Sequence, residues 1–284
     1  MACSPSDAGF LAERLVARLR SLEACAVAFS GGVDSAVVAK AAQLALGDRA
    51  MAVTAVSASL AKGERETASE LARLIGIRHE LVHTGELTNP AYVRNAPDRC
   101  FHCKDELYSH LQEIAERFGV TTFANGANAD DAGDYRPGMQ AAREHAVRSP
   151  LAECGMTKEQ VRTLARYWDL PVWDKPAAPC LSSRIAYGEE VTPERLRMID
   201  EAEQFLRALG LATVRVRYHR GDLARLEVPL EAVSRLCQEP LRGQIVAHLA
   251  KLGFKFVTLD LEGFRSGSLN ALVPLESLRS ARLR

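Results

Sequence analysis

Residues 24–35 read Ala24-Cys25-Ala26-Val27-Ala28-Phe29-Ser30-Gly31-Gly32-Val33-Asp34-Ser35, and this stretch decides the fold. The apolar run Ala24–Phe29 predicts a buried strand, and Ala36–Leu46 predicts a helix. A strand that breaks into a Ser/Gly turn and opens a helix presents backbone N–H groups at the positive end of that helix, where phosphate binds. The two glycines let the backbone approach an anion without a Cβ in the way. We therefore predict a phosphate site whose donors are Ser30, Gly31, Gly32 and Ser35.

The loop differs from the two commonest phosphate-binding motifs. No Gly-Lys-Ser/Thr follows, as a Walker A loop requires, and the spacing Gly-x-Gly-x-x-Gly is absent. It resembles instead the pyrophosphate loop (PP-loop) of enzymes that split ATP into AMP and pyrophosphate. The alternative is an ordinary strand-to-helix turn, but the strand, loop and helix patterns all agree with the PP-loop. Asp34 cannot donate to phosphate, and two roles are open to it: holding Mg²⁺ or capping the helix.

Strands and helices alternate beyond this loop. Further strands are predicted at Met51–Val56, His79–His83 and Val120–Ala124, and helices at Gly63–Ile75 and Asp105–Phe118. This alternation predicts an α/β fold with a Rossmann-like parallel sheet covered on both sides, of the PP-loop ATP pyrophosphatase type. Ligands of such sheets bind beyond the carboxyl ends of the strands. Ser57 and the segment Asn125–Asp131 lie at such ends, as the phosphate loop does.

The segment Asn125–Asp131 contains further candidate nucleotide contacts, namely Gly126, Asp130 and Asp131. The functional interpretation of the acidic pair is Mg²⁺ binding or ordering of the loop at the nucleotide. The alternative is a solvated turn without a function. The phosphate loop elsewhere in the sequence favours the functional interpretation.

The pattern changes after Tyr187-Gly188. Before it come a helix at Thr157–Trp168, with Thr157 as its candidate cap, and a Pro- and Ala-rich loop. After it we expect a smaller C-terminal α+β domain of order αββαβ, with Pro193 near the start of its first helix. The predicted elements are a helix at Thr192–Leu209, a hairpin of Thr213–Tyr218 and Leu223–Val228, a helix at about Leu230–Leu252 and a strand at Lys255–Leu261. The expected domains are a PP-loop ATP-binding domain, 1–186, and a substrate-binding and oligomerisation domain, 187–284.

Composition narrows the possible partners. The chain has 284 residues, is 47% hydrophobic and carries a formal net charge of +0. No basic field therefore argues for nucleic acid, and no apolar run reaches the roughly 18–20 residues of a membrane span. The first residues contain no basic or apolar signal segment, so we expect a cytoplasmic protein. In that compartment its seven cysteines are better explained as thiols, metal ligands or catalytic groups than as disulfides.

Three cysteines form the second chemical signal. Cys100-Phe101-His102-Cys103 places two thiols where a helix begins, an arrangement suited to redox work or metal binding. Cys180 stands in the Pro-rich loop, followed by two hydroxyls and Arg184. Three thiolates can hold a [4Fe-4S] cluster with one iron open, or zinc with His102 or water as the fourth ligand. The spacing alone leaves cluster, zinc and no metal open.

Arginines form the third signal. Arg215 and Arg217 alternate along one predicted strand and therefore share a face. Their guanidinium groups, with those of Arg184 and Arg265 in loops, match phosphate and carboxylate as bidentate forks. The alternative is a solvated sheet face with ion pairs to the neighbouring strand, which carries Arg225 and Glu227.

Several segments together resemble the LarE family of ATP-dependent sulfur transferases, which help to build the nickel-pincer nucleotide cofactor. The resemblance covers nearly the whole chain, and its most specific part is Cys180-Leu181-Ser182-Ser183-Arg184-Ile185-Ala186-Tyr187-Gly188. The other matching segments are Ser30–Ser35, Arg99–Lys104, Asn125–Asp131, Ser149–Leu151, Pro179–Arg184 and Val214–Arg217.

The resemblance implies a reaction. ATP would adenylylate a carboxylate of a pyridinium dicarboxylate mononucleotide, and a sulfur nucleophile would then displace AMP to give a thiocarboxylate, twice per substrate. Members with only the cysteine matching Cys180 sacrifice its sulfur, whereas members with three cysteines hold a [4Fe-4S] cluster that carries an added sulfide. This chain has all three, so the resemblance favours ATP, Mg²⁺ and a cluster on Cys100, Cys103 and Cys180, with zinc as the alternative.

The resemblance also assigns roles to individual residues. Cys180, Asp34 and Arg184 would be catalytic, and Lys104 would offset charge on the leaving pyrophosphate. The substrate's phosphate and second carboxylate would be held by Arg184, Arg215 and Arg217. Glu203 matches an acidic position of the family that binds a cation, although a Glu on a helix surface is usually only solvated. Expected partners are the nucleotide substrate, a sulfide donor and further copies of the chain.

Two other functions compete with this prediction. A tRNA thiolase or an ammonia-using synthetase would share the PP-loop, but a thiolase needs a basic surface that a net charge of +0 does not favour. A zinc-stabilised nucleotide-binding module without catalysis would share the loop and the cysteines.

Overall fold

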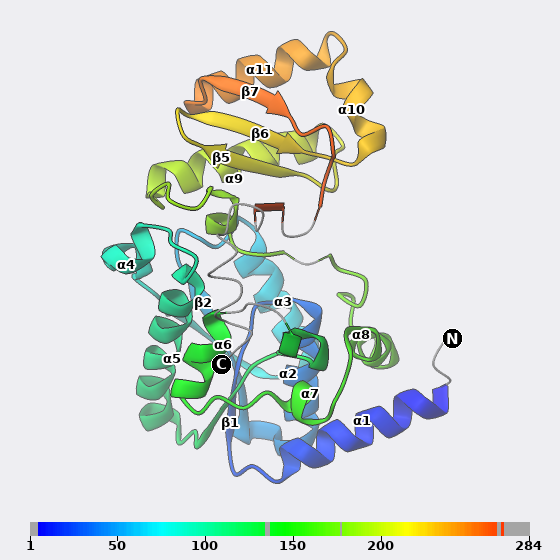
Figure 1. Ribbon diagram of the computed structural model, residues 1–284. Coiled ribbons are helices and arrows are strands. Elements are labelled where there is room, and N and C mark those ends of the chain that lie inside the picture. The colour runs from blue at the N-terminus through cyan, green and yellow to red at the C-terminus, as the bar shows by residue number, and fades with distance from the viewer. Residues whose placement is uncertain (1–4, 134–136, 177, 266–267, 270–284) are drawn as a thin grey trace. The chain divides into compact units, whose positions relative to one another are not determined.

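The protein is described by a computed structural model covering residues 5–133, 137–176, 178–265 and 268–269 (Figure 1). These residues form two compact units. The first unit comprises residues 1–57, 63–85 and 100–178, and the second comprises residues 58–62, 86–99 and 179–284. The second unit thus takes two short stretches from the N-terminal half of the chain. The domain limits expected from the sequence, 1–186 and 187–284, stay a prediction.

The first unit contains a parallel sheet of four strands in the order β3-β2-β1-β4. Its strands are β1 (Cys25–Ala28), β2 (Ala50–Val56), β3 (Arg78–His83) and β4 (Thr122–Ala124). Its helices are α1 (Pro5–Arg20), α2 (Val33–Leu46), α3 (Glu64–Ile75), α5 (Arg99–Phe118), α6 (Pro137–Glu144), α7 (Pro150–Glu153) and α8 (Lys158–Tyr167). This confirms the predicted α/β class and all four predicted parallel strands.

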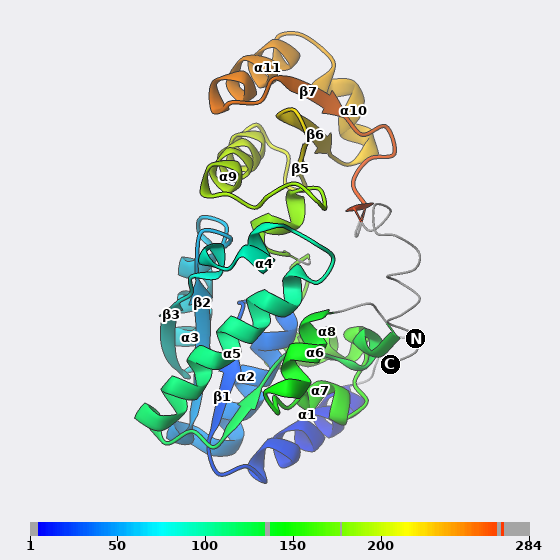
Figure 2. The same cartoon turned by 60° about the vertical axis from the view of Figure 1, so that its left-hand side comes forward.

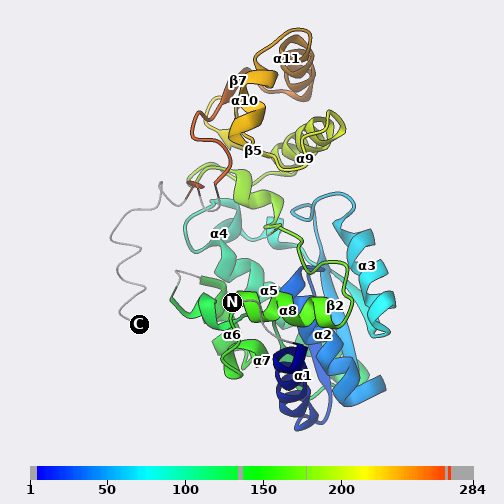
Figure 3. The ribbon, with the colours of Figure 1, turned by 90° about the vertical axis from the view of Figure 1, so that its right-hand side faces the viewer.

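Helices cover both faces of this sheet, as a parallel sheet requires. Along β1, Cys25 and Val27 face a core shared with α1, α2, α3 and α8. Ala26 and Ala28 face the opposite core, which is completed by residues of α5 and α6. Figure 2 shows α5 in front of the strands, and Figure 3, from the other side, shows α1 and α8 in front. The unbroken apolar character of Ala24–Phe29 follows from this double burial.

Local signals fix the ends of these helices. Gly76 ends α3 in a left-handed conformation with φ of 78°, and its N–H bonds to the carbonyls of Ala72 and Arg73. Thr157 begins α8 with a capping box, in which its side chain and that of Gln160 each accept a backbone N–H of the other residue. Both signals were readable in the sequence.

The second unit contains a sheet of three strands in the order β5-β6-β7. Strands β5 (Arg215–His219) and β6 (Leu223–Glu227) form the predicted antiparallel hairpin, and β7 (Phe256–Leu259) lies parallel to β6. The helices are α4 (Pro90–Val93), α9 (Pro193–Ala208), α10 (Leu230–Leu236) and α11 (Leu241–Leu252). Helix α9 packs on β5 and α11, and Thr192 caps α9 with Pro193 at its first turn, as expected.

Several elements differ from the prediction, and α4, α6 and α7 were not predicted. The single helix expected at Leu230–Leu252 is two helices, because Pro240 has no N–H and disfavours helical geometry in the residue before it. Helix α5 begins at Arg99, six residues before the predicted start at Asp105. Helix α1 was not predicted, although Leu11, Leu15 and Leu19 recur at helical spacing and are all buried.

Candidate active site

The phosphate loop lies where the strand order reverses. The chain runs from β1 through β2 to β3 on one side of β1, and then returns to place β4 on the other side. Ligands of open α/β sheets bind outside the carboxyl ends of the strands at such a switch point. The two segments there are the loop after β1, Ser30–Gly32, and the loop after β4, which begins at Asn125.

The phosphate loop is ordered by its own side chains. Gly31 has a φ of 69°, in the left-handed region that glycine tolerates best. The Ser35 hydroxyl donates to the Gly32 carbonyl at 3.0 Å and lies 3.2 Å from the Ser30 hydroxyl. The Ser30 N–H donates to Ser35 Oγ at 3.3 Å. Helix α2 has Gly32 as its N-cap without a side-chain hydrogen bond to its first turn. That turn can therefore offer its N–H groups to an anion.

Gly126 allows the loop after β4 to approach the start of α2. A Cβ at this position would lie 2.8 Å from the Ser35 nitrogen and 3.0 Å from the Asp34 Cβ. Atoms that close would overlap, so glycine is required by backbone approach and not by φ. The loop after β4 thereby reaches the helix end that would bind phosphate.

Asp34 is held by side chains from two other segments. Its Oδ1 accepts a hydrogen bond from Asn128 Nδ2 at 3.1 Å, and its Oδ2 accepts one from Lys158 Nζ at 2.5 Å. Asp34 is the second residue of α2 and does not cap it. Of the two roles open to Asp34, capping is therefore wrong, and the binding of Mg²⁺ stays a prediction.

The pair Asp130 and Asp131 orders the loop after β4. Asp130 Oδ2 accepts the backbone N–H of Lys158 at 2.8 Å, and Asp131 Oδ2 accepts that of Asn128 at 3.0 Å. The Asn128 Oδ1 in turn accepts the Asp130 N–H at 3.0 Å. A solvated turn does not describe this arrangement. The two carboxylates support a structured loop beside Asp34, and their metal role stays a prediction.

Lys158 is a site residue that the sequence analysis missed. A lysine in the first turn of a helix faces the positive end of the helix dipole, which disfavours a cation. The ion pair with Asp34 offsets this cost. The unusual placement of a lysine directly after the capping Thr157 was the signal that could have revealed it.

Ser57 and Lys104 are the remaining predicted contacts of the nucleotide. Ser57 follows β2 at the carboxyl edge of the sheet, and Lys104 lies half-buried in the second turn of α5. Their contacts with the nucleotide stay a prediction.

The cysteines fall into two classes. Burial raises the pKa of Cys25 to about 12, so this thiol is a core residue. Cys100 is exposed in the first turn of α5, and Cys103 follows on the same side of the helix. Cys180 is exposed at the start of a 3₁₀ turn, Leu181–Arg184.

The three predicted metal ligands are divided between the units. Cys100 and Cys103 belong to the first unit and Cys180 to the second. Among the described residues, no three His, Cys, Asp or Glu side chains form a group that could bind a metal ion. The donor set fits a thiophilic centre, since two thiols lie one helical turn apart and thiolates are the usual ligands of zinc and iron–sulfur centres.

Arg184 and Glu203 form a buried ion pair behind Cys180. Glu203 is fully buried and binds Arg184 Nε at 3.0 Å and Arg207 Nη2 at 2.6 Å. Arg184 Nη1 donates to the carbonyls of Cys180, at 2.9 Å, and Pro179. Glu203 is therefore not a solvated helix residue, and the contacts of Arg184 are those of a residue that fixes the Cys180 loop.

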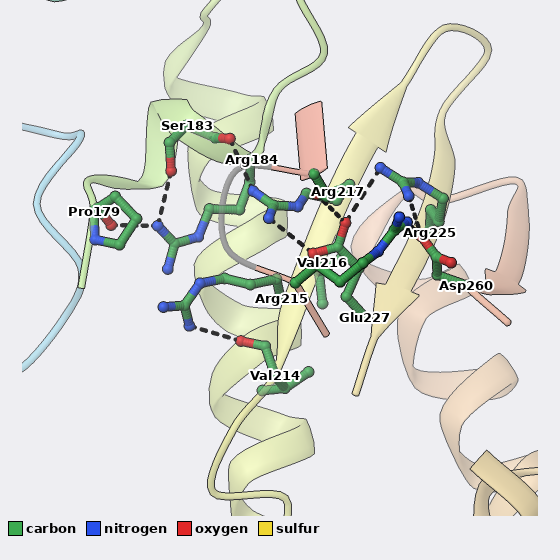
Figure 4. A network of polar contacts seen from close by, with 12 residues as sticks. Pro179, Ser183, Arg184, Val214, Arg215, Val216, Arg217, Arg225, Glu227 and Asp260 are labelled. Atoms are coloured by element: carbon green, nitrogen blue, oxygen red, sulfur yellow. Dashed lines mark hydrogen bonds and ion pairs between the residues drawn. The ribbon is translucent and has the colours of Figure 1, made fainter. Parts of the chain in front are cut away.

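Arg217 and Arg215 complete this cluster (Figure 4). Arg217 donates to the Ser183 carbonyl at 3.0 Å and to Glu227 at 2.8 Å, so the cross-strand pairing considered as an alternative exists in part. Its Nε is nevertheless buried without a hydrogen-bond partner among the described residues. Burial, together with the positive charge of Arg184, lowers the pKa of Arg215 to about 10. An anion would relieve both conditions.

Arg265 lies outside this cluster. Its guanidinium pairs with Asp260 at 3.3 Å and with Glu262 at 2.7 Å. Arg225 binds the same Asp260 carboxylate. The two ion pairs of Arg265 thus stabilise the turn after β7.

A parallel α/β sheet with a Ser-Gly-Gly-Val-Asp-Ser loop at its switch point defines a PP-loop nucleotide-binding enzyme. In agreement, the asparagine synthase family pattern matches residues 10–150. The B subunit of the glutamine-hydrolysing GMP synthase of Pyrococcus horikoshii is 28% identical over 196 residues, which is 62% of this chain and 61% of the relative.

Two relatives extend over nearly the whole chain. An uncharacterized protein of Synechocystis is 49% identical over 252 residues, which is 89% of this chain and 94% of the relative. The pyridinium-3,5-bisthiocarboxylic acid mononucleotide synthase of Lactiplantibacillus plantarum is 38% identical over 257 residues, 90% of this chain and 92% of the relative. The chain belongs to the LarE family of ATP-dependent sulfurtransferases.

Proposed function

We propose that this protein converts the carboxylates of a pyridinium dicarboxylate mononucleotide to thiocarboxylates in nickel-pincer cofactor synthesis. A free carboxylate is a poor electrophile, so it must first be activated. Its oxygen attacks the α-phosphorus of ATP, pyrophosphate leaves, and an acyl adenylate forms. A sulfur nucleophile then attacks the carbonyl carbon and AMP departs with the C–O electron pair, which leaves the thiocarboxylate.

The activating half of the reaction belongs to the phosphate loop. The N–H groups at the start of α2 and the hydroxyls of Ser30 and Ser35 would bind the phosphates of ATP. Asp34, with Asp130 or Asp131, would hold Mg²⁺ on the same phosphates, since carboxylate oxygens are its preferred ligands. Lys158 Nζ lies 2.5 Å from Asp34 Oδ2. Its positive charge would also stabilise the negative charge that develops on the leaving pyrophosphate.

The buried cluster of Arg184, Arg215 and Arg217 is the main support for an anionic substrate. A guanidinium N–H of Arg217 is buried without a partner among the described residues, and Arg215 lies beside it with a lowered pKa. A buried unsatisfied donor costs about 1–3 kcal/mol, which a bound phosphate or carboxylate would recover. The phosphate of a mononucleotide supplies such an anion.

Cys180 would supply the sulfur. Its loop is fixed by Arg184 and Arg217, which also belong to the anion cluster. If Cys180 gives up its own sulfur, the Cβ–Sγ bond breaks as the α-proton leaves, and dehydroalanine remains. A [4Fe-4S] cluster held by Cys100, Cys103 and Cys180 would instead supply an additional sulfide and spare Cys180.

The Cys180→Ala variant separates the two halves of the reaction. We expect pyrophosphate release within about twofold of wild type and thiocarboxylate formation below detection, because activation does not need the thiol. Cys237→Ala, which removes another exposed thiol of the second unit, is the matched control and should keep both activities. Thiocarboxylate formation by Cys180→Ala would refute the role of Cys180.

Metal analysis after anaerobic purification decides between the sulfur sources. A cluster predicts iron and acid-labile sulfide in the wild-type protein, both lost in Cys100→Ala and Cys103→Ala but retained in Cys237→Ala. Zinc without iron would exclude the cluster. Mass spectrometry of Cys180 after one turnover should then show an intact cysteine if a cluster carries the sulfide, and dehydroalanine if it does not.

A further inference from the structure

A buried group of three side chains, Tyr92, Asn95 and Arg99, grips the loop that carries Cys180. We call this group the clamp. All three residues are at most 4% exposed, and they belong to the second unit together with Cys180. None of them was singled out as a functional residue from the sequence.

Two members of the clamp bind Ser182, and the third binds the loop further along. The Tyr92 hydroxyl lies 2.6 Å from Ser182 Oγ, and Arg99 Nη1 donates to the Ser182 carbonyl at 2.8 Å. The Asn95 amide donates to the carbonyl of Ala186 at 2.9 Å and to that of Ile185 at 3.3 Å. The loop is therefore gripped at two, five and six residues beyond Cys180.

The clamp is also braced internally. Arg99 Nη1 donates to the Asn95 Oδ1 at 2.5 Å. Asn95 has a φ of 56°, which puts its backbone in the left-handed region that costs energy for residues other than glycine. This conformation is compatible with a side chain that reaches two carbonyls of the loop and the guanidinium of Arg99 at once.

Arg99 connects the two cysteine-bearing segments through the chain itself. It is the first residue of α5, and Cys100 is the next residue. Its guanidinium binds Ser182, two residues after Cys180. A buried arginine bound to carbonyl groups is a costly way to gain stability, because an apolar residue would avoid the desolvation penalty. Its directional donors are better suited to fixing a geometry.

We propose that Arg99, supported by Asn95, is a positioning residue for sulfur transfer: it holds the Cys180 loop against the first residue of the helix that carries Cys100 and Cys103. This inference rests on the proposed function for its chemical consequence, but the clamp itself can be tested without any sulfur chemistry. The contacts of Arg99 named above lie within the second unit, whereas the phosphate loop belongs to the first, so we expect adenylylation to continue without Arg99.

The test compares Arg99→Met with Arg94→Met, an exposed arginine five residues earlier in the same unit. Hydrogen exchange of the amides of residues 181–188 should become about tenfold or more faster in Arg99→Met and stay unchanged in the control. Thiocarboxylate formation should fall about 10- to 100-fold, as expected for a misplaced reacting group, while pyrophosphate release stays within about twofold.

Two milder variants keep the test decisive if Arg99→Met does not fold. Arg99→Lys keeps one donor and should restore part of the sulfur transfer. Asn95→Gly keeps the left-handed backbone without the amide and should have the same selective effect as Arg99→Met.

Two results would overturn the proposal. The first is unchanged exchange of residues 181–188 in a folded variant. The second is a parallel loss of pyrophosphate release and sulfur transfer, which would make Arg99 merely structural. A wild-type protein that forms no thiocarboxylate would refute the proposed function instead, and the exchange measurement would still decide whether the clamp exists.

Discussion

Asp34 and Lys158 illustrate what single residues contribute to the phosphate site. Asp34 is the second residue of α2, where the helix dipole stabilises its negative charge. Lys158 is the first residue of α8, where the helix dipole disfavours its positive charge. The ion pair at 2.5 Å makes the two placements compatible. A local motif can thus depend on a residue 124 positions away.

Lys158→Met is predicted to impair activation and not sulfur delivery. Loss of the Nζ leaves the Asp34 charge without its lysine, and we expect pyrophosphate release to fall about 10- to 1,000-fold, as for other groups that stabilise developing charge. The measurement is single-turnover release of pyrophosphate at saturating ATP. Lys175→Met, which breaks an ion pair with Glu64 at 2.9 Å in the same unit, is the control. Equal loss in both variants would contradict a specific role for Lys158.

At the scale of elements, the position of the loops was easier to predict than their internal contacts. Strand β1, the loop and α2 follow from periodicity and two glycines, which act locally. The roles of Gly126 and Glu203 depend on what lies opposite them in space, which periodicity does not encode. The break between α10 and α11 was predictable in principle, because Pro240 stands in the sequence.

Gly126→Ala tests the close approach of the loop after β4 to α2. The added methyl group would lie 2.8 Å from the Ser35 nitrogen, so one of the two segments must move. We expect ATP affinity, measured by calorimetry, to weaken about tenfold or more while the thermal midpoint changes by only a few degrees. Gly9→Ala in α1, where the new Cβ meets no atom closer than 3.8 Å, should leave affinity unchanged. Unaltered ATP binding by Gly126→Ala would argue against a tight fit.

Glu153 gives the first unit a pH dependence. Hydrogen bonds from Arg148 and Arg18 lower its pKa to about 2, from 4.5. Because the folded pKa lies below the unfolded value, this stabilisation is complete above pH 4.5 and disappears as the pH falls toward 2. At this partly exposed site, solvent screening leaves about 1 kcal/mol or less.

Glu153→Gln should therefore be less stable than wild type at pH 7, and the difference should shrink as the pH falls below 4.5. Denaturant titrations at several pH values would measure it. A difference that is constant from pH 7 to pH 3 would contradict the assignment.

At the scale of the whole molecule, the balance of charge limits the class of substrate. The formal net charge is +0, and Arg184 and Arg217 of the buried cluster are paired with carboxylates. None of the described helices is long and apolar enough to cross a membrane. Family membership was accessible from the motifs, whereas the clamp was not. Asn95 and Arg99 bind backbone carbonyl groups, which any sequence would provide, and Tyr92 lies 90 positions from its partner Ser182.

The balance of charge predicts that the affinity of the protein for tRNA is low. In a filter-binding assay at physiological salt, the dissociation constant for bulk tRNA should be weaker than about 100 µM. A micromolar constant that weakens steeply with added salt would point to a phosphate-binding surface and would favour the thiolase alternative.

The interleaving of the two units limits how this enzyme can be cut or recombined. The second unit includes residues 58–62 and 86–99, which lie between strands of the first. Ser59, in the first of these insertions, accepts the N–H of Leu181, next to Cys180. A fragment beginning at residue 187 would leave behind both insertions and the Cys180 loop. Activation and sulfur delivery therefore cannot be exchanged between homologues as separate cassettes, and chimaeras must carry both insertions with the C-terminal half.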